Sequence, residues 1–296
     1  MGYAMTRADE QTAGSIISPC EASSVVGIKP TVGLVSRSAV VPISPQQDTL
    51  GPMGRTVEDA AAMLSAMAGR DPHDSKTDGI PFDCIPDYQA ASHRRDVSQY
   101  RIGIPRQTFD KVSQPILDAF EDVVEKLRTQ GATIVDCEYA GQARYRTMTS
   151  DQKCAFLTSE FKPALAAYFS SLTTNPHDIT DLAAIVSFTR ATPAEEFPAR
   201  PIEFFEQSLA IADDAEALRE AAEVRTYLGS EGGVPGALDT YKLDALLFPT
   251  EAWTTNYLAA AGGSPQIAIP LGFLPADFPV EMNDTGTLVS RGPNIP

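Results

Sequence analysis

The chain is poor in the residues on which metal and redox chemistry depend. Its 296 residues include 4 cysteines and 3 histidines, and no two cysteines form a CxxC pair. These residues are scattered along the chain, at Cys20, Cys84, Cys137, Cys154, His73, His93 and His177. Metal ligands usually cluster at short spacings, so we expect no metal site and no cofactor. The thiols are expected to be reduced and mostly structural.

Positive charge is also scarce. The chain has 23 basic against 39 acidic residues, which gives a formal net charge of -16. Nucleic acids and anionic membranes bind positive surfaces, so neither is an expected partner. The simplest interpretation of the acidity is solubility.

Long apolar segments are missing as well. No stretch reaches the ~18 apolar residues that a membrane span requires. The start of the chain, MGYAMTRADE, contains no apolar core of a secretory signal. We therefore expect no membrane span and a cytoplasmic location.

Short apolar runs and one long helical period indicate an α/β fold. The first is a β-branched run closed by Pro30, and the runs predict strands at Val25–Lys29, Arg101–Ile104, Thr133–Cys137, Ala245–Phe248 and Gln266–Ile269. Apolar residues at helical spacing from Ile116 to Leu127 predict a helix between the second and third strands. That β-α-β order favours a parallel pair. Residues 149–228 are predicted to be mostly helical, and a further helix is expected between Thr56, in a capping box with Asp59, and Gly69.

A dense series of glycines, prolines and polar residues runs from Thr12 to Asp74. Its motifs are, in order, Gly14-Ser15-Ile16 with Pro19, Gly27-Ile28-Lys29-Pro30-Thr31, Ser36-Arg37, Gly51-Pro52-Met53, and Arg55-Thr56-Val57 with Asp59. Together these motifs resemble the amidase signature family, serine hydrolases that use a Ser–cis-Ser–Lys triad. The resemblance implies a central mixed, mainly parallel sheet flanked by helices. It also implies an amidohydrolase that cleaves C–N bonds other than peptide bonds in small-molecule amides.

The resemblance assigns the nucleophile to Ser15. Backbone N–H groups of Thr12, Ala13, Gly14 and Ser15 would form the oxyanion hole, where small residues let a carbonyl oxygen approach the backbone. Ala13 stands where the family usually has Gly or Asp. Taken alone, Gly14-Ser15-Ile16 would indicate only a helix-capping serine.

The two partners of the nucleophile are not found in this sequence. In the family both the catalytic Lys and the cis-Ser precede the nucleophile, yet residues 1–14 contain neither Lys nor Ser. Lys29 is the nearest lysine, but it falls in a structural motif and is expected to be a surface or strand-end charge. We therefore expect an impaired hydrolase. The alternatives are a non-catalytic pseudoenzyme or binding remnant, and a fragment that does not fold stably alone.

The same resemblance divides the chain into residues 1–11, which do not match, and residues 12–296, a partial amidase signature domain truncated at both ends. Met1 to Glu10 does not look like the buried strand that precedes the nucleophile in the family. Asp48, Arg55 and Asp59 are interpreted as structural anchors for buried polar groups. Ser24 and Ala39 replace family glycines, and they would be strained if those glycines have positive φ.

Overall fold

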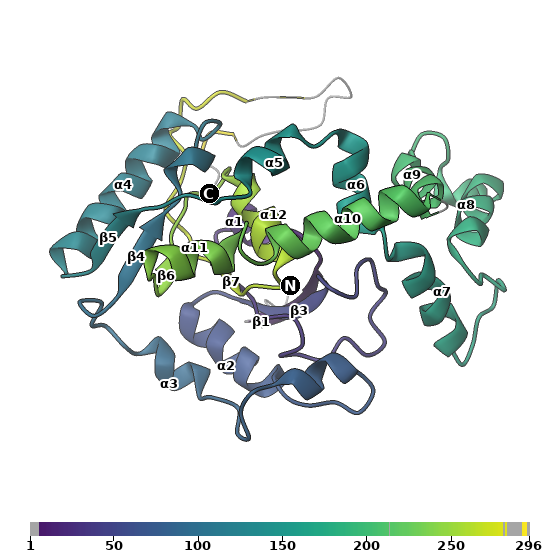
Figure 1. The fold of residues 1–296 in the computed structure, drawn as a ribbon, viewed down its shortest axis with the longest axis horizontal. Coiled ribbons are helices and arrows are strands. Elements are labelled where there is room, and N and C mark those ends of the chain that lie inside the picture. The colour runs from purple at the N-terminus through teal and green to yellow at the C-terminus, as the bar shows by residue number, and fades with distance from the viewer. Residues whose placement is uncertain (1–5, 213, 281, 283–291, 295–296) are drawn as a thin grey trace.

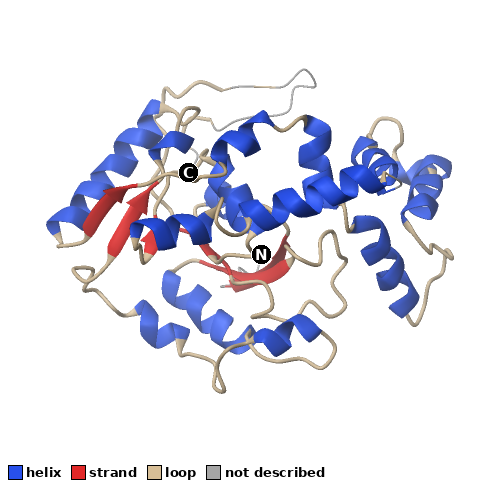
Figure 2. Ribbon diagram, in the orientation of Figure 1, coloured by secondary structure: helices blue, strands red, loops and turns tan. Residues whose placement is uncertain are grey.

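The computed structural model describes residues 6–212, 214–280, 282 and 292–294. Over these residues the chain is a mixed α/β protein with two sheets and surrounding helices (Figure 1 and Figure 2). The larger sheet has 4 strands in the order β1-β3-β2-β7, and the smaller has 3 strands in the order β5-β4-β6. The mixed α/β class predicted from the sequence is therefore confirmed.

The larger sheet is antiparallel throughout. Its strands are β1 (Thr6–Gln11), β2 (Val26–Lys29), β3 (Thr49–Gly54) and β7 (Gln266–Ala268). β3 lies between β1 and β2, and β2 also pairs with β7. The connection from β2 to β3 holds no helix, and a parallel pair would need a long crossover there. The predicted single, mainly parallel sheet is wrong for these strands.

The smaller sheet is parallel, as the β-α-β order predicted. β4 (Arg101–Ile104) pairs with β5 (Thr133–Asp136) and with the short β6 (Ala245–Leu246). Helix α4 (Gln114–Thr129) forms the crossover between β4 and β5. It buries Ile116, Phe120 and Val124 in one cluster with Ile104. β6 is shorter than its predicted range, Ala245–Phe248.

The segment before the nucleophile motif is a strand, which corrects the prediction for Met1 to Glu10. β1 begins at Thr6 and pairs with β3 along its whole length, from Thr6 opposite Gly54 to Gln11 opposite Thr49. Apart from Ala8 its residues are polar, and both Arg7 and Ala8 are exposed. Backbone pairing with β3, rather than apolar burial, therefore defines this strand.

Two helices cover the two faces of the larger sheet. A Cβ at Gly27 would lie 2.4 Å from Cys20 Sγ of helix α1 (Ile17–Ser23). A Cβ at Gly54 would lie 2.9 Å from the Ala60 amide nitrogen of helix α2 (Val57–Met67). Both glycines are required by this close approach of helix to strand. α1 and α2 thus pack closely on the sheet from opposite sides.

The start of α2 follows the sequence prediction in part. Thr56 Oγ1 accepts a hydrogen bond from the Asp59 amide at 3.1 Å. Among the described residues, the Asp59 side chain returns no bond to Thr56, so only half of the predicted capping box forms. α2 ends at Met67, two residues before the predicted stop at Gly69.

The remaining helices lie around this core. They are α3 (Tyr88–Ser92), α5 (Gln142–Thr147), α6 (Ser150–Thr158), α7 (Phe161–Ser171), α8 (Leu182–Ala191), α9 (Glu203–Ala212), α10 (Ala215–Leu228), α11 (Val234–Tyr241) and α12 (Trp253–Ala261), with short 3₁₀ turns at Ser75–Gly79, Arg106–Thr108 and Pro193–Glu195. The predicted helical character of residues 149–228 is confirmed, and Figure 1 shows α7, α8 and α9 gathered at one end of the molecule. None of the described helices is long and apolar enough to cross a membrane.

Candidate active site

Ser15 lies in the turn that connects β1 to α1. Its side chain is exposed, whereas the next two residues, Ile16 and Ile17, are 0% and 3% exposed. The Gly14 carbonyl accepts a hydrogen bond of 2.7 Å from the Ser18 amide, which closes the turn into the helix. The two buried isoleucines hold the turn against the sheet and leave the Ser15 hydroxyl facing solvent.

The side chain of Gln11 holds the C-terminal side of this turn, where the chain enters α1. Gln11 is the last residue of β1 and is fully buried. Its Oε1 accepts the Ile16 amide at 2.8 Å and the Ile17 amide at 2.9 Å. The first two amides after Ser15 are therefore occupied by a protein acceptor.

Thr12 and the carboxyl groups of Asp48 and Glu10 hold the N-terminal side of the turn. Thr12 Oγ1 donates to Asp48 Oδ1 at 2.7 Å, while Asp48 Oδ2 accepts the Ile43 and Ser44 amides at 2.8 and 2.9 Å. Asp48 thus satisfies buried backbone groups, as its interpretation as a structural anchor required.

Glu10 adds a second carboxyl group to this cluster. Burial, together with the neighbouring charge of Asp48, raises the pKa of Glu10 to about 7. Burial also raises the pKa of Asp48, against the lowering effect of its hydrogen bonds from Thr12, Ile43 and Ser44. When two carboxyl groups lie close together in a partly buried site, ionising both of them costs free energy. We therefore expect Glu10 and Asp48 to share one proton near neutral pH.

Three backbone amides of the turn are left without a protein partner. Within the described residues, the N–H groups of Ala13, Gly14 and Ser15 donate to no acceptor. Ala13 and Gly14 are half-buried, so these donors lie at the protein surface beside the hydroxyl. The indole of Trp253, the first residue of α12, would be 3.5 Å from a Cβ at Gly14, and it is 42% exposed.

Lys29 is at the end of a strand, as the last residue of β2, but it is not the surface charge that the sequence also suggested. It is 0% exposed, and its Nζ donates to the Pro30 carbonyl at 3.0 Å. Burial lowers the pKa of Lys29 to about 7. No carboxylate among the described residues forms an ion pair with it. Lys29 lies in the interior because β2, to which it belongs, is a mostly buried strand.

Of the two arginines in the remaining motifs, Arg37 has a structural role because its side chain is bonded to other residues. Arg37 Nη2 lies 2.7 Å from Asp74 Oδ1, and Arg37 Nη1 donates to the Pro45 carbonyl at 2.6 Å. These bonds hold the loop between β2 and β3 against the turn at Asp74 and lower the pKa of Asp74 to about 2. Arg55, by contrast, is exposed and pairs with none of the described residues, so its interpretation as an anchor is wrong.

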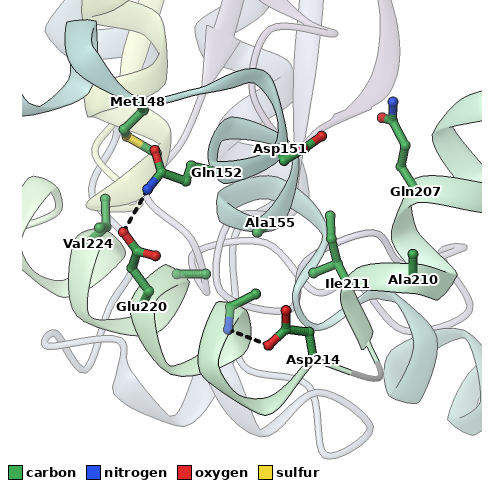
Figure 3. Close-up of a pocket in the computed structure, with 12 residues that line it drawn as sticks. Met148, Asp151, Gln152, Ala155, Gln207, Ala210, Ile211, Asp214, Glu220 and Val224 are labelled. Atoms are coloured by element: carbon green, nitrogen blue, oxygen red, sulfur yellow. Dashed lines mark hydrogen bonds between the residues drawn. The ribbon is translucent and has the colours of Figure 1, made fainter.

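A separate cavity of about 310 Å³ lies between α6, α9 and α10 (Figure 3). Its floor is apolar, with Ala155, Ile211 and Val224, and Gln152 Nε2 donates to Glu220 Oε1 across one side at 2.8 Å. Among the described residues that line it there is no serine, cysteine, lysine or histidine, and its ionisable groups are the carboxyl groups of Asp151, Asp214 and Glu220. None of the described lining residues belongs to the Ser15 turn, so the two sites are distinct. No group of described residues could hold a metal ion.

An exposed serine beside unpaired backbone amides is the arrangement that acyl-transferring serine hydrolases use. A sequence model of the family described as Amidase matches residues 10–268. The chain belongs to the amidase signature family, as its motifs indicated.

Individual relatives agree with this assignment. The chain is 37% identical over 301 residues to a putative amidase of Arthroderma benhamiae, covering 100% of this chain and 50% of that protein. It is 32% identical over 268 residues to a probable amidase of Arabidopsis thaliana, covering 89% of this chain and 49% of the relative. The peptide amidase of Stenotrophomonas maltophilia is similar in structure, with a TM-score of 0.78 and 31% identity over 92% of this chain and 56% of that one. The chain spans about half the length of the curated relatives that it matches.

Three residues around the turn escaped the sequence interpretation. Gln11 and Glu10 fell in a segment that was not assigned as a strand, so their orientation was not considered. A polar residue at a strand end, a few positions before a helix, is a local signal that could have identified Gln11 as an acceptor for the helix amides. Trp253 comes from the far end of the sequence, and nothing local connects it to Gly14.

Proposed function

We propose that this chain carries the nucleophile of an amidohydrolase, with Ser15 attacking the carbonyl carbon of a small-molecule carboxylic amide. The observation that supports this most is the exposed Ser15 hydroxyl in a turn with unpaired amides at Ala13, Gly14 and Ser15. Family membership indicates amide hydrolysis as the reaction class, and the turn identifies Ser15 and the neighbouring amides as the residues proposed to carry it out.

The proposed reaction is acyl transfer followed by hydrolysis. Ser15 Oγ forms a bond to the carbonyl carbon, the C–N bond breaks, and the amine leaves with a proton. Water then cleaves the acyl-serine ester. The unpaired amides of Ala13, Gly14 and Ser15 would bind the oxyanion, and one such donor is typically worth ~10²–10³ in rate.

A base for Ser15 is not evident among the residues that the structure describes. Residues 1–14 contain neither Lys nor Ser, the residue types that the family places before its nucleophile. Lys29 is fully buried and directs its Nζ to the Pro30 carbonyl. General-base assistance is typically worth ~10²–10⁴-fold. We therefore propose that these residues alone hydrolyse amides weakly.

The second candidate is a non-catalytic binding remnant of the amidase fold, and the same lack of Lys and Ser favours it. The two candidates differ in whether Ser15 reacts at all. A fluorophosphonate probe makes this difference measurable, because Ser15 Oγ would bond to phosphorus as fluoride leaves.

The test compares residues 1–296 with the Ser15→Ala variant after both are shown to be folded by circular dichroism. Labelling that is slow but confined to Ser15 is expected if the chain is an impaired hydrolase. Equal lack of labelling in both proteins would instead support the binding remnant. Labelling as fast as that of an intact amidase signature enzyme would show that a base is present in these residues, with Lys29 the first residue to replace.

A further inference from the structure

We propose that Gln11 is a positioning residue for the nucleophile, because its side chain holds the turn that presents Ser15 and separates the occupied amides from the free ones. This proposal rests on the proposed role of Ser15. It adds a residue that acts through the turn rather than by touching the substrate.

The contacts of Gln11 define that role. A carbonyl oxygen has two lone pairs, and Gln11 Oε1 uses both, accepting the Ile16 and Ile17 amides at 2.8 and 2.9 Å. The side chain is fully buried, so no water competes for these bonds. The amides immediately after Ser15 are therefore withdrawn from substrate, and those of Ala13, Gly14 and Ser15 are the ones left to receive an oxyanion.

Gln11 is itself held in place by two further amide side chains. Gln266 Nε2 donates to Asn256 Oδ1 at 2.9 Å, which directs Gln266 Oε1 toward Gln11 Nε2, 3.5 Å away. Asn256 is 3% exposed and Gln266 is half-buried. The chain of three amides connects β1, β7 and α12 behind the turn.

Loss of these contacts would release the turn from the strand that precedes it. The Ser15 hydroxyl and the free amides must keep a fixed relation for attack and oxyanion binding to occur together. Since Gln11 Oε1 accepts only from amides that follow Ser15, a change there moves the nucleophile without removing any proposed donor.

The variants test whether the position of the Gln11 acceptor oxygen matters, or only the burial of a side chain at this position. Gln11→Leu removes the acceptor, and Gln11→Asn shortens the side chain so that one oxygen cannot reach both amides. Gln11→Glu keeps an oxygen acceptor at the same reach. Gln142→Leu is the matched control, since Gln142 is also a buried glutamine, bonded to the Gln107 carbonyl, and contacts no residue of the turn.

Two readouts are measured on the full 296-residue chain: hydrogen exchange of the Ile16 and Ile17 amides, and the rate of fluorophosphonate labelling of Ser15. For Gln11→Leu we expect both amides, and for Gln11→Asn at least one of them, to exchange at least about tenfold faster than in the unchanged protein, with a fall of at least about tenfold in labelling in both variants. Gln11→Glu should restore both, and Gln142→Leu should change neither. If Gln11→Leu does not fold, Gln11→Asn alone decides.

Unchanged exchange and labelling in Gln11→Asn would overturn the proposal, as would equal losses in Gln11→Glu. The exchange measurement does not depend on Ser15 being reactive. If the unchanged protein is labelled no faster than Ser15→Ala, the proposed hydrolase activity fails, while faster exchange confined to Ile16 and Ile17 would still support the control of the turn by Gln11.

Discussion

Lys29 is the largest side chain that the fold buries completely, and its amine forms one hydrogen bond, to the Pro30 carbonyl. Burial lowers the pKa of Lys29 from 10.5 to about 7. Between these two values the unfolded chain binds a proton that the folded chain does not, so stability falls as the pH decreases through this window. Below about pH 7 the full cost of burying the charge is present.

Replacing this amine by a thioether should therefore stabilise the protein most at low pH. For Lys29→Met we expect the free energy of unfolding to rise by about 2–3 kcal/mol at pH 6, after allowing for the lost hydrogen bond. The gain should shrink to nearly nothing at pH 10, measured by urea denaturation at both values. A gain of the same size at both pH values would show that packing, rather than charge, is responsible.

Glu10 predicts the opposite pH dependence. Burial raises its pKa from 4.5 to about 7, so between these values the folded chain holds a proton that the unfolded chain releases. Stability due to this group is complete below pH 4.5 and is lost as the pH rises through 7.

Glu10→Gln should consequently stabilise the protein at pH 8, by about 1–2 kcal/mol once solvent screening of this half-buried group is allowed for. At pH 4.5 the difference should vanish. Thermal unfolding at the two pH values measures it, with Glu138→Gln, at an exposed carboxylate, as control. A stabilisation that grows toward low pH would rule out a shared proton at Glu10 and Asp48.

At the scale of elements, two loop residues have the left-handed backbone that was suspected where family glycines are replaced. Ser24, at the end of α1, has φ 52, and Ala39, in the turn closed by the Val40 amide on the Arg37 carbonyl, has φ 63. A side chain at positive φ costs roughly 1–2 kcal/mol. The sequence comparison therefore found two strained positions that no periodicity would reveal.

Glycine should relieve this strain. We expect Ala39→Gly to stabilise the protein by about 0.5–1 kcal/mol, because lost strain exceeds the added entropy of the unfolded chain. The control is Ala222→Gly at an exposed position inside α10, which should destabilise by a similar amount. Denaturation midpoints of the two variants should move in opposite directions, and a shift of the same sign in both would contradict the strain.

The elements that could be predicted from sequence are those whose signal is local. The apolar period from Ile116 to Leu127 identified α4, and the β-branched runs located β2, β4 and β5. Strand pairing was only partly predictable, because β2 and β7 meet across most of the chain. The site shows the same division: the motif located Ser15, but the side-chain bonds of Gln11 and the burial of Lys29 depend on tertiary packing.

At the scale of the whole molecule, an exposed apolar edge favours association between copies of the chain, whereas the large negative charge opposes it. β7 is an edge strand of the larger sheet, and the side chains of Ile267, Ile269 and Phe273 are 47%, 61% and 69% exposed. Edge strands of this kind tend to pair with other chains. The net charge of -16 keeps copies apart at low ionic strength.

Self-association should therefore increase with salt, as screening shortens the range of the repulsion. We expect the chain to form larger species when salt is raised from about 0.05 M to about 0.5 M, followed by light scattering after size-exclusion chromatography. Ile269→Lys should reduce this association. Val41→Lys, at a 54% exposed loop position outside β7, should leave it nearly unchanged. Equal effects of the two lysines would mean that β7 is not the contact.

The position of Trp253 has an optical consequence. It is the only tryptophan in the sequence, and its indole packs against Gly14, beside Ser15. Tryptophan emission from this protein therefore arises at a single place, the proposed catalytic turn. A ligand that covers Ser15 should shift that emission to shorter wavelengths and shield it from acrylamide quenching, so occupancy of the turn can be followed without a label, even in a chain that does not turn over.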